Sequence, residues 1–344
     1  MTTDFRLPRT VALELTYRCN HNCIFCSCPW YYEKNKYPVR EELNAEGWYR
    51  AIDILYDNGI DTFSVSGGEV LLKDGFGDIL RHIREEGERR GHHNEIVLIS
   101  NGRLMREEYL ALFKKLDIHL SMSLPGYETF KAHTGVDNAD GVLYWFRKAK
   151  ECGIPTTLNV TVTKKNLHEL FRTLSLGILN GAGDVLVNRF LPGGRGLKLK
   201  NELSLSPGEV NEMLRTAEEV LRYAKTPGFV GTEIALCAIE DPSRYEWLRI
   251  GYACAAAKGF FVVDPAGQIR VCNHSVRVVG NIFSTPIISD VGYWNMFSLS
   301  RHKPDVCRTR CPVKDLCDCG CREAANILCG SPAVPDITLF DPSL

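Results

Sequence analysis

The sequence predicts an α/β fold, a partial (β/α)6 TIM barrel followed by a smaller cysteine-rich domain. Strand-like and helix-like segments alternate six times between residues 11 and 225, which favours parallel strands joined by right-handed crossovers. Six units fall short of the eight of a full barrel. The alternation ends near residue 228, where the density of cysteines rises. We therefore predict a barrel domain over residues 1–227 and a second domain over residues 228–344.

The six predicted strands are short segments rich in β-branched or aromatic residues, each followed by a polar loop: 11–16, 62–66, 95–100, 118–124, 156–163 and 185–190. Amphipathic stretches follow them at 44–57, 76–87, 106–115, 139–151 and 166–179, and a further helix at 207–225 opens with Ser206 and Pro207. Beyond residue 228 the clearest element is a hairpin at 259–272, with its turn at 264–267.

The composition indicates a globular protein and excludes several classes of partner. The chain is 44% apolar and 24% charged, with a net charge of −1, so it lacks the basic excess of a nucleic-acid binder. No apolar run approaches the roughly 18 residues that a membrane helix needs. The first residues contain no apolar signal-peptide core. We expect a cytoplasmic protein.

Fourteen cysteines need an explanation in such a chain, because disulfides do not persist in a reducing compartment. Cys19, Cys23 and Cys26 are spaced Cx3Cx2C directly after the first strand, at the end of a barrel that carries active sites. Three thiolates can hold three irons of a [4Fe–4S] cluster and leave the fourth iron open. Zinc would need a further donor, which Cys28 or His21 could supply. Buried inert thiols are the third reading.

Short polar motifs also follow the next three predicted strands. They are Ser66-Gly67-Gly68-Glu69, Ser100-Asn101-Gly102 and Ser123-Leu124-Pro125-Gly126. Each alone is often only a turn. Because all fall at the carboxyl ends of successive parallel strands, together they predict one binding site.

With these motifs, the Cx3Cx2C loop, including Phe25, resembles the signature of radical S-adenosylmethionine (SAM) enzymes. The resemblance implies that Phe25 lies against the adenine, that the element ending in Glu69 receives the amino group of SAM, and that Ser123 contacts the ribose. It also places Ser66, Gly67, Gly68, Ser100 and Asn101 around SAM. Val70 and Pro125 depart from the usual Pro and Asp. The implied reaction is reductive cleavage of SAM to a 5′-deoxyadenosyl radical, which abstracts hydrogen from the substrate.

The C-terminal cysteines resemble the SPASM domain of radical SAM enzymes that carry two auxiliary [4Fe–4S] clusters, although Cys307 and Cys311 stand one residue further apart than usual. The resemblance implies an outer cluster on Cys307, Cys311, Cys317 and Cys329, and an inner cluster on Cys254, Cys272 and Cys321. No cysteine lies between 254 and 272 to complete the inner set. That cluster then has an open iron or recruits Cys237 or Cys319. A pair of zinc sites is the alternative.

The resemblance favours a peptide or protein substrate, because SPASM enzymes mostly modify peptide side chains by cross-linking, oxidation or epimerisation. Sulfatase-maturing relatives carry an Asp base after the second SPASM cysteine, whereas this chain has Asn273 and then His274. His274 is therefore a candidate base, or a hydrogen-bond donor beside a cluster. Arg189 could contact SAM or a substrate carboxylate, or form an ordinary salt bridge. On the fifth strand, Asn159, Thr161 and Thr163 share one face, which we expect to line the pocket.

Three functional hypotheses follow. The first is a SPASM-type enzyme that modifies a precursor peptide, with three [4Fe–4S] clusters, SAM, an external flavodoxin-like or ferredoxin-like electron donor and a separate leader-peptide recognition protein. The second is oxidation of a small molecule. The third is a non-catalytic metal-binding scaffold or electron carrier, which would not turn over SAM.

Overall fold

The computed structural model describes residues 7–340 except 33 and 35, and within them one sheet contains eleven strands. Six of these are the predicted barrel strands: β1 (Thr10–Glu14), β2 (Thr62–Ser66), β3 (Glu95–Ser100), β4 (Ile118–Ser123), β5 (Thr156–Val162) and β6 (Asp184–Arg189). Each is parallel to the next in chain order. The partial (β/α)6 barrel is confirmed, and the carboxyl ends of its strands meet on one face.

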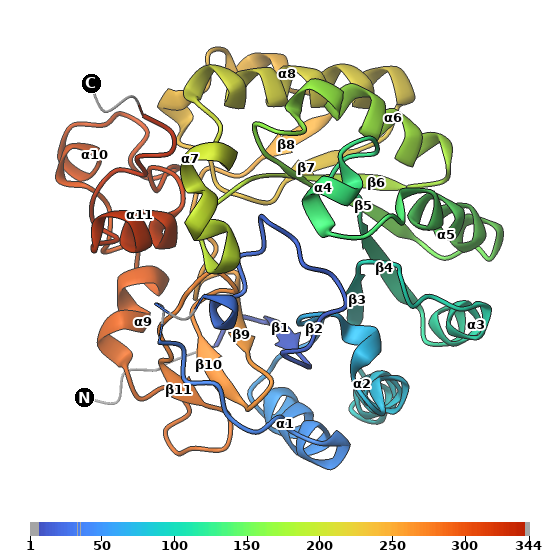
Figure 1. Ribbon diagram of the computed structural model, residues 1–344. Coiled ribbons are helices and arrows are strands. Elements are labelled where there is room, and N and C mark those ends of the chain that lie inside the picture. The colour runs from blue at the N-terminus through green and yellow to red at the C-terminus, as the bar shows by residue number, and fades with distance from the viewer. Residues whose placement is uncertain (1–6, 33, 35, 341–344) are drawn as a thin grey trace.

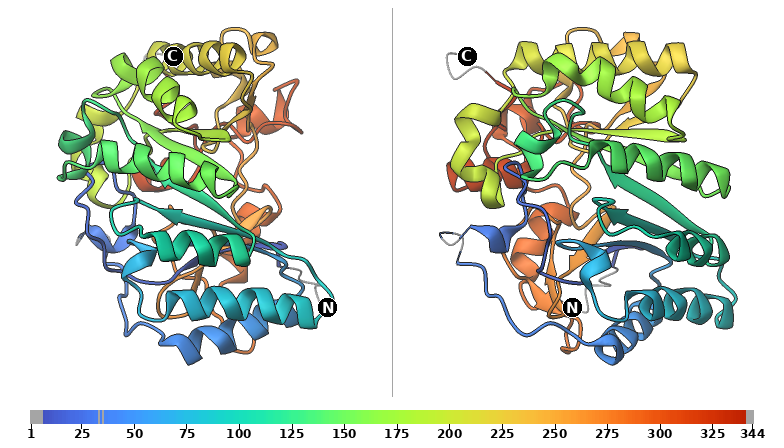
Figure 2. Two further views of the ribbon diagram at one scale, coloured as in Figure 1. Left: turned by 90° about the vertical axis from the view of Figure 1, so that its right-hand side faces the viewer. Right: turned by 45° about the vertical axis from the view of Figure 1, so that its right-hand side comes forward.

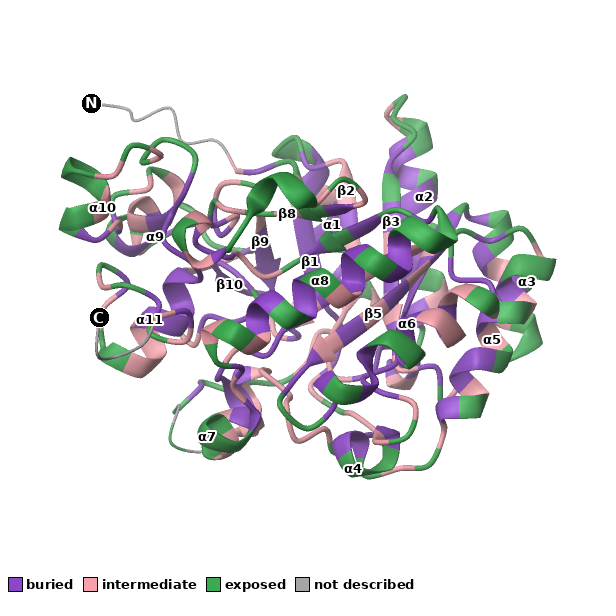
Figure 3. Cartoon of the chain, turned by 90° about the horizontal axis from the view of Figure 1, so that it is seen from above, coloured by how far each residue is buried: buried purple, intermediate pink, exposed green. Residues whose placement is uncertain are grey.

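Helices cover the outer face of this curved sheet (Figures 1 and 2). They are α1 (Ala45–Asp57), α2 (Phe76–Arg89), α3 (Glu107–Lys115), α5 (Ala139–Glu151), α6 (Leu170–Leu179) and α8 (Pro207–Ala224). The short helices α4 (Phe130–Thr134) and α7 (Lys200–Leu203) lie instead at the end of the barrel where the carboxyl ends of the strands meet. The predicted face of α1, formed by Trp48, Ile52 and Leu55, has no exposed surface. Buried and exposed residues alternate along α5 and α8 (Figure 3), as the amphipathic pattern predicts.

The sheet continues beyond the sixth strand, where we predicted that the repeats stop. β7 (Gly228–Val230) and β8 (Leu248–Ile250) add two further parallel strands next to β6. At the opposite edge β9 (Phe260–Val263) pairs in parallel with β1, and β10 (Gln268–Arg270) and β11 (Gly280–Asn281) complete the sheet. The sheet is therefore continuous across residue 228. Periodicity did not reveal β7 and β8 because three residues are too few to establish a pattern.

The predicted hairpin is confirmed. Its strands are β9 and β10, and the amide of Gly267 donates to the carbonyl of Asp264 to close the turn. Gly267 has φ +80°, a left-handed conformation that glycine adopts without strain. The segments after the hairpin contain three short helices, α9 (Val291–Ser298), α10 (Asp305–Thr309) and α11 (Arg322–Cys329), which lie beside β9–β11 and the end of the barrel (Figure 1).

Two buried ion pairs connect the C-terminal region to the barrel strands. Arg270 of β10 pairs with Glu14 of β1, and Arg189 of β6 pairs with Asp336 at 2.5 Å. Both arginines are at most 2% exposed. In the part of the chain that the structure describes, no helix is long and apolar enough to cross a membrane.

Candidate cofactor-binding cavity

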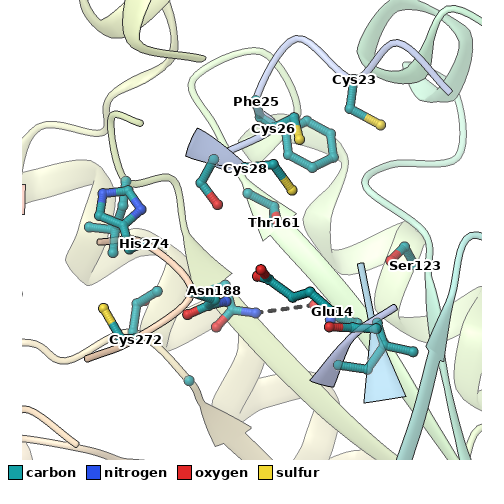
Figure 4. Close-up of a pocket in the computed structure, with 18 of the residues that line it drawn as sticks. Glu14, Cys23, Phe25, Cys26, Cys28, Ser123, Thr161, Asn188, Cys272 and His274 are labelled. Carbon is teal, nitrogen blue, oxygen red and sulfur yellow. Dashed lines mark hydrogen bonds between the residues drawn. The ribbon is translucent and has the colours of Figure 1, made fainter. Parts of the chain in front are cut away.

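A cavity of about 400 Å³ lies at the carboxyl ends of the barrel strands. The predicted N-terminal motifs and the predicted C-terminal cysteines both contribute residues to this cavity. The Cx3Cx2C loop and the polar strand ends line one part, and thiols of the C-terminal region line another. Figure 4 shows Cys23, Cys26 and Phe25 above the cavity, with Cys272 and His274 on its far side. Residues from distant parts of the sequence thus share one cavity.

The Cx3Cx2C loop, residues 19–26, is held by the chain around it. The amides of Asn22 and Ile24 donate to the carbonyls of Thr134 and His133, at 2.8 and 2.9 Å. The guanidinium of Arg195 donates to the carbonyl of Cys23 at 3.0 Å. Backbone hydrogen bonds leave the thiols of Cys19, Cys23 and Cys26 directed to the cavity, which all three line. Burial raises the pKa of the Cys19 thiol to about 11, so binding a metal there displaces a proton.

Cys28 also lines the cavity, but its thiol interacts with a neighbour. A hydrogen bond from the Cys28 side chain lowers the pKa of Cys26, because it stabilises the Cys26 thiolate. A residue that donates to a metal-binding sulfur need not bind the metal itself.

Gly67 and Gly68 allow the end of β2 to pack against the base of the cysteine loop. Two backbone hydrogen bonds join the two segments. The amide of Gly68 donates to the carbonyl of Thr16, and the amide of Glu69 donates to the carbonyl of Arg18, each at 2.8 Å. A Cβ on Gly68 would lie 2.1 Å from the Arg18 carbonyl oxygen. We expected the glycines to admit a ligand. In the structure the group that approaches them most closely is the chain's own backbone, immediately before Cys19.

The Glu69 side chain is buried and receives three hydrogen bonds. Ser100 Oγ and the Asn101 amide donate at 2.8 Å each, and the Leu71 amide donates at 3.2 Å. Burial raises the pKa of Glu69, while these donors oppose the rise. The motifs after β2 and β3 therefore form one hydrogen-bonded unit. Asn101 extends it to the cysteine loop by donating to Asn20 Oδ1 at 2.7 Å.

The inner face of β5 is polar, as predicted for Asn159 and Thr161, which line the cavity. Asn188 of β6 donates to Asn159 Oδ1 at 3.1 Å (Figure 4). Thr163, which we placed on the same face, is not at the cavity; its amide and hydroxyl bond to Asn166. The predicted Ser66 and Ser123 also line the cavity. These side chains offer donors and acceptors for a polar ligand.

Cys254, Cys272 and Cys321 are buried and line the same cavity as the N-terminal cysteines. Two of them, Cys254 and Cys321, lie beside a buried carboxylate. The amides of Cys254 and Cys321 donate to Asp318 at 2.8 Å and to Asp336 at 2.9 Å. Two separate carboxylates thus hold the backbone of these cysteines in position. The structure brings the inner set of thiols together at the cavity.

His274 lines the cavity and packs against Gly193. A Cβ on Gly193 would lie 2.5 Å from the His274 ring, so only glycine fits there. His274 Nε2 bonds to the Pro192 carbonyl at 3.0 Å. Because a carbonyl only accepts, the proton is on Nε2 and Nδ1 remains an acceptor. Burial lowers the pKa of His274 to about 4, so the ring is neutral at neutral pH.

Arg189 lines the cavity, but most of its guanidinium is engaged within the protein. Nη1 donates to Thr338 Oγ1 at 2.5 Å, and Nη2 donates to Asp336 and to the Glu233 carbonyl. Nε is buried and has no hydrogen-bond partner among the described residues. The structure therefore shows the salt bridge that we had weighed against a ligand contact.

Three cavity carboxylates were missed by our sequence analysis. Glu14 pairs with Arg270, Glu323 accepts from the Tyr293 hydroxyl at 2.7 Å, and Glu233 accepts from the Ala255 amide at 3.0 Å. Burial raises the pKa of Glu233. Glu14 carried a signal, since a charged residue between the apolar Leu13 and Leu15 of a predicted strand faces away from the apolar side. Glu233 and Glu323 carried none, because their positions depend on tertiary packing.

A second group of thiols lies away from the cavity lining and contains Cys237, Cys307, Cys311, Cys317 and Cys319. Cys319 and Cys237, which we had considered for the inner set, both belong to it. The amides of Leu236 and Cys319 donate to Cys317 Sγ, at 3.5 and 3.3 Å. Cys307 shares a hydrogen bond with the Cys319 thiol. Neither Cys237 nor Cys319 lines the cavity.

The donor sets fit iron–sulfur clusters better than zinc. Among the described residues, no three His, Cys, Asp or Glu side chains converge as the ligands of one metal ion must. A zinc site needs four donors about 2.0–2.3 Å from one centre. In a [4Fe–4S] cluster each cysteine binds a different iron, so its thiols surround a volume instead of a point. Each wall of this cavity is lined by three thiols that do not converge on one point.

Comparison with known proteins finds similarities to this chain, beginning with its N-terminal part. Residues 13–176 match the model of the Radical SAM superfamily. The chain is 26% identical to an AdoMet-dependent heme synthase of Methanosarcina barkeri, over 94% of this chain and 93% of that protein. It is 24% identical to a PqqA peptide cyclase of Bradyrhizobium diazoefficiens, over 96% and 86%.

Solved structures agree on the fold. Streptococcus suis SuiB bound to its precursor peptide SuiA superposes with a TM-score of 0.71 at 16% identity, over 97% of this chain and 76% of that chain. The likeness extends past the barrel into the C-terminal cysteine-rich region, because it covers nearly the whole chain.

Proposed function

We propose that this chain, in which residues 13–176 form a radical SAM domain, uses SAM to modify a side chain of a peptide. One observation carries the proposal: a single cavity is lined on one wall by Cys19, Cys23 and Cys26 and on the other by Cys254, Cys272 and Cys321. A substrate in this cavity would contact a SAM site and a second redox centre together. The polar ends of β4–β6 lie between the two walls.

The N-terminal wall has the groups that SAM requires. When bound there, a [4Fe–4S] cluster and SAM supply a 5′-deoxyadenosyl radical that abstracts a hydrogen atom. Cys19, Cys23 and Cys26 would hold the cluster. Glu69, which carries one of the few carboxylates on this wall, would accept from the ammonium group of SAM. Phe25, Ser66, Gly67, Gly68, Ser100, Asn101 and Ser123 would surround the rest of the molecule.

The C-terminal region, residues 228–344, would form the auxiliary-cluster domain. Cys254, Cys272 and Cys321 would hold the inner cluster beside the substrate, and the second group of thiols would hold the outer one. Two auxiliary clusters and the SAM cluster make three in all. An oxidative modification releases one electron after hydrogen abstraction, and such a domain would accept it.

The same oxidation also releases a proton, and the cavity wall offers acceptors for it. Nδ1 of the neutral His274 is one. The carboxylates of Glu233 and Glu323 are two more, and neither is paired with a basic side chain in the described structure. Arg189 would not act as a base. It pairs with Asp336 and donates to the Glu233 carbonyl, so it would hold the backbone of Glu233 in position at the cavity.

Relatives support a peptide as the substrate class. One is named a PqqA peptide cyclase, and a structural neighbour was solved with its precursor peptide bound. The reducing cytoplasm suits the free thiols of this chain. The partners we propose are a precursor peptide, a separate protein that recognises its leader, and an external flavodoxin-like or ferredoxin-like electron donor.

A small-molecule substrate is the second candidate, and one comparison favours it. The AdoMet-dependent heme synthase aligns over 94% of this chain, nearly as much as the 96% of the PqqA peptide cyclase. Its name specifies a small-molecule product. The two candidates differ in the molecule from which hydrogen is abstracted, which is a peptide in the first and a small molecule in the second.

A deuterium-transfer assay distinguishes them. The purified enzyme with reconstituted iron would be incubated without oxygen with SAM, dithionite and the deuterated peptide encoded by a short reading frame beside its gene. We expect deuterium in the 5′-deoxyadenosine and a changed peptide mass. Deuterium-free 5′-deoxyadenosine with an unchanged peptide, together with transfer from a deuterated porphyrin, would reject the peptide and support the small molecule.

A further inference from the structure

Positive charge is concentrated on two segments beside the cavity. Residues 30–36 follow the Cx3Cx2C loop, and residues 194–200 follow β6. Together they contain five basic residues and one acidic residue, so their net charge is five minus one, or +4, whereas the whole chain has −1. We call these two segments the basic rim.

The two segments of the basic rim lie against each other, although they are far apart in the sequence (Figure 1). The guanidinium of Arg195 lies over the ring of Tyr31, with 4.5 Å between Cζ and the ring centroid. The ammonium of Lys198 lies 5.6 Å from the ring centroid of Tyr32. Cation–π attraction is weak at exposed sites, but it favours these positions of the basic side chains. The aromatic side chains of one segment thus support the charges of the other.

The basic rim is attached to a wall of the cavity. The amide of Gly196 donates to the carbonyl of Cys26 at 3.1 Å. Gly194 packs so closely on the same loop that a Cβ there would lie 2.4 Å from the Cys28 carbonyl oxygen. Cys26 and Cys28 both line the cavity. A ligand that extends out of the cavity over this wall therefore meets the rim.

The lysines of the basic rim have no acidic partner within the described structure. Four of them are exposed, and none forms an ion pair with another described residue: Lys34, Lys36, Lys198 and Lys200. Lys165, in the loop after β5 at the same end of the barrel, differs because it pairs with Glu202 at 2.8 Å. Unpaired charges of one sign attract a ligand of the opposite sign, so the rim is complementary to an anionic ligand.

We propose that the basic rim binds acidic side chains of the peptide substrate, so that the enzyme selects a peptide with Asp or Glu residues close to the modified residue. The inference rests on the proposed function, because it takes a peptide as the substrate. A peptide whose reacting side chain lies in the cavity has to continue across the cavity wall, and three extended residues cover about 10 Å. Attraction by the rim would speed association and fix the direction in which the peptide lies.

Peptide kinetics of charge-reversal variants test the inference. The iron-loaded holoenzyme would be assayed without oxygen with SAM, dithionite and the peptide encoded by a short reading frame beside its gene, so that no protein donor is present. Combining Lys198→Glu with Lys200→Glu should raise KM for the peptide about tenfold and change kcat much less, because attractions become repulsions. The matched control, Lys115→Glu with Arg222→Glu, makes the same change of charge on the outer helices α3 and α8 and should leave KM within about twofold.

Changes in the peptide test the same contact from the other side. Replacing its Asp and Glu residues near the modified residue by Asn and Gln should raise KM of the wild type, and should raise KM of the Lys198→Glu, Lys200→Glu variant no further. Replacing them by Lys should raise KM of the wild type again and lower KM of that variant, since opposite charges then face each other once more.

Several results would overturn this inference and leave the proposed function intact. They are a modified peptide without acidic residues near the modified position, a KM that the rim variant leaves unchanged, and an equal rise of KM in the control. An effect that appears only when a flavodoxin-like protein replaces dithionite would also overturn it, because the rim would then bind the electron donor. A wild-type enzyme that transfers no deuterium from the peptide to 5′-deoxyadenosine would overturn the proposed function as well.

Discussion

The barrel strands and the cysteine-rich region are stabilised in different ways. β1–β6 contain five to seven residues each, and their outward side chains, such as Phe63, Leu98 and Leu158, are completely buried under helices. From residue 228 onward the strands contain two to four residues and the helices five to eight. This region also contains buried charges that pair with barrel residues, Arg270 with Glu14 and Asp336 with Arg189.

The difference shows what each region needs in order to fold. Burial of a large apolar side chain contributes about 1.5–3 kcal/mol, so the barrel has a sufficient core of its own. A buried ion pair contributes little net stability, because desolvation offsets the attraction. The short elements of the cysteine-rich region therefore need further interactions, and under the proposed function iron bound by its thiols would supply them.

Removal of iron should have the largest effect, and it should affect the cysteine-rich region far more than the barrel. We expect backbone amides in β9, β10 and α11 to exchange more than about a hundredfold faster in the apoprotein, because metal binding and folding are coupled. Amides of β2–β5 should change little. Hydrogen exchange with mass spectrometry checks this, and equal acceleration in both regions would show that the barrel is not independent of the iron.

Arg270→Met tests the connection between the regions and should have the next largest effect. The guanidinium donates to the carbonyls of Asn273 and Ser275 at 3.0 and 2.9 Å as well as to Glu14. Its loss leaves a buried carboxylate unpaired, which should lower the free energy of unfolding by about 3–5 kcal/mol.

The control is Arg277→Met, in the same segment. Arg277 is 56% exposed in its ion pair with Asp290, so the change should cost no more than about 1 kcal/mol. Denaturant unfolding of both variants measures the difference. Equal effects would mean that the buried pair with Glu14 does not connect the two regions.

Ser206→Ala should have a smaller effect that is confined to the barrel. Ser206 caps α8, and with Glu209 it forms a capping box in which each side chain bonds to the other's backbone amide. Its loss should cost about 1 kcal/mol with or without iron. Ser175→Ala, on the exposed side of α6, should stay within about 0.5 kcal/mol. A cost for Ser206→Ala that appears only in the holoprotein would contradict the independence of the barrel.

The same contrast explains what could be predicted from the sequence. The bounds of β2 and β3 were predicted to the residue, because alternating apolar residues and polar loops are local signals. The binding motifs were found for the same reason, since parallel strands bring their carboxyl ends together.

Features made by contacts between distant segments could not be predicted. The pairing of β9 with β1 places Glu14 beside Arg270, 256 residues apart. Glu233 reaches the cavity only because β7 continues the sheet.

Reductive cleavage of SAM by cysteine variants tests the central claim most directly. The holoenzyme, a Cys19, Cys23 and Cys26 to Ala variant, and Cys28→Ala would each be incubated with SAM and dithionite without oxygen. The account predicts 5′-deoxyadenosine from the wild type and from Cys28→Ala, and none above background from the triple variant. Formation of 5′-deoxyadenosine by the triple variant, or its absence from the iron-loaded wild type, would contradict it.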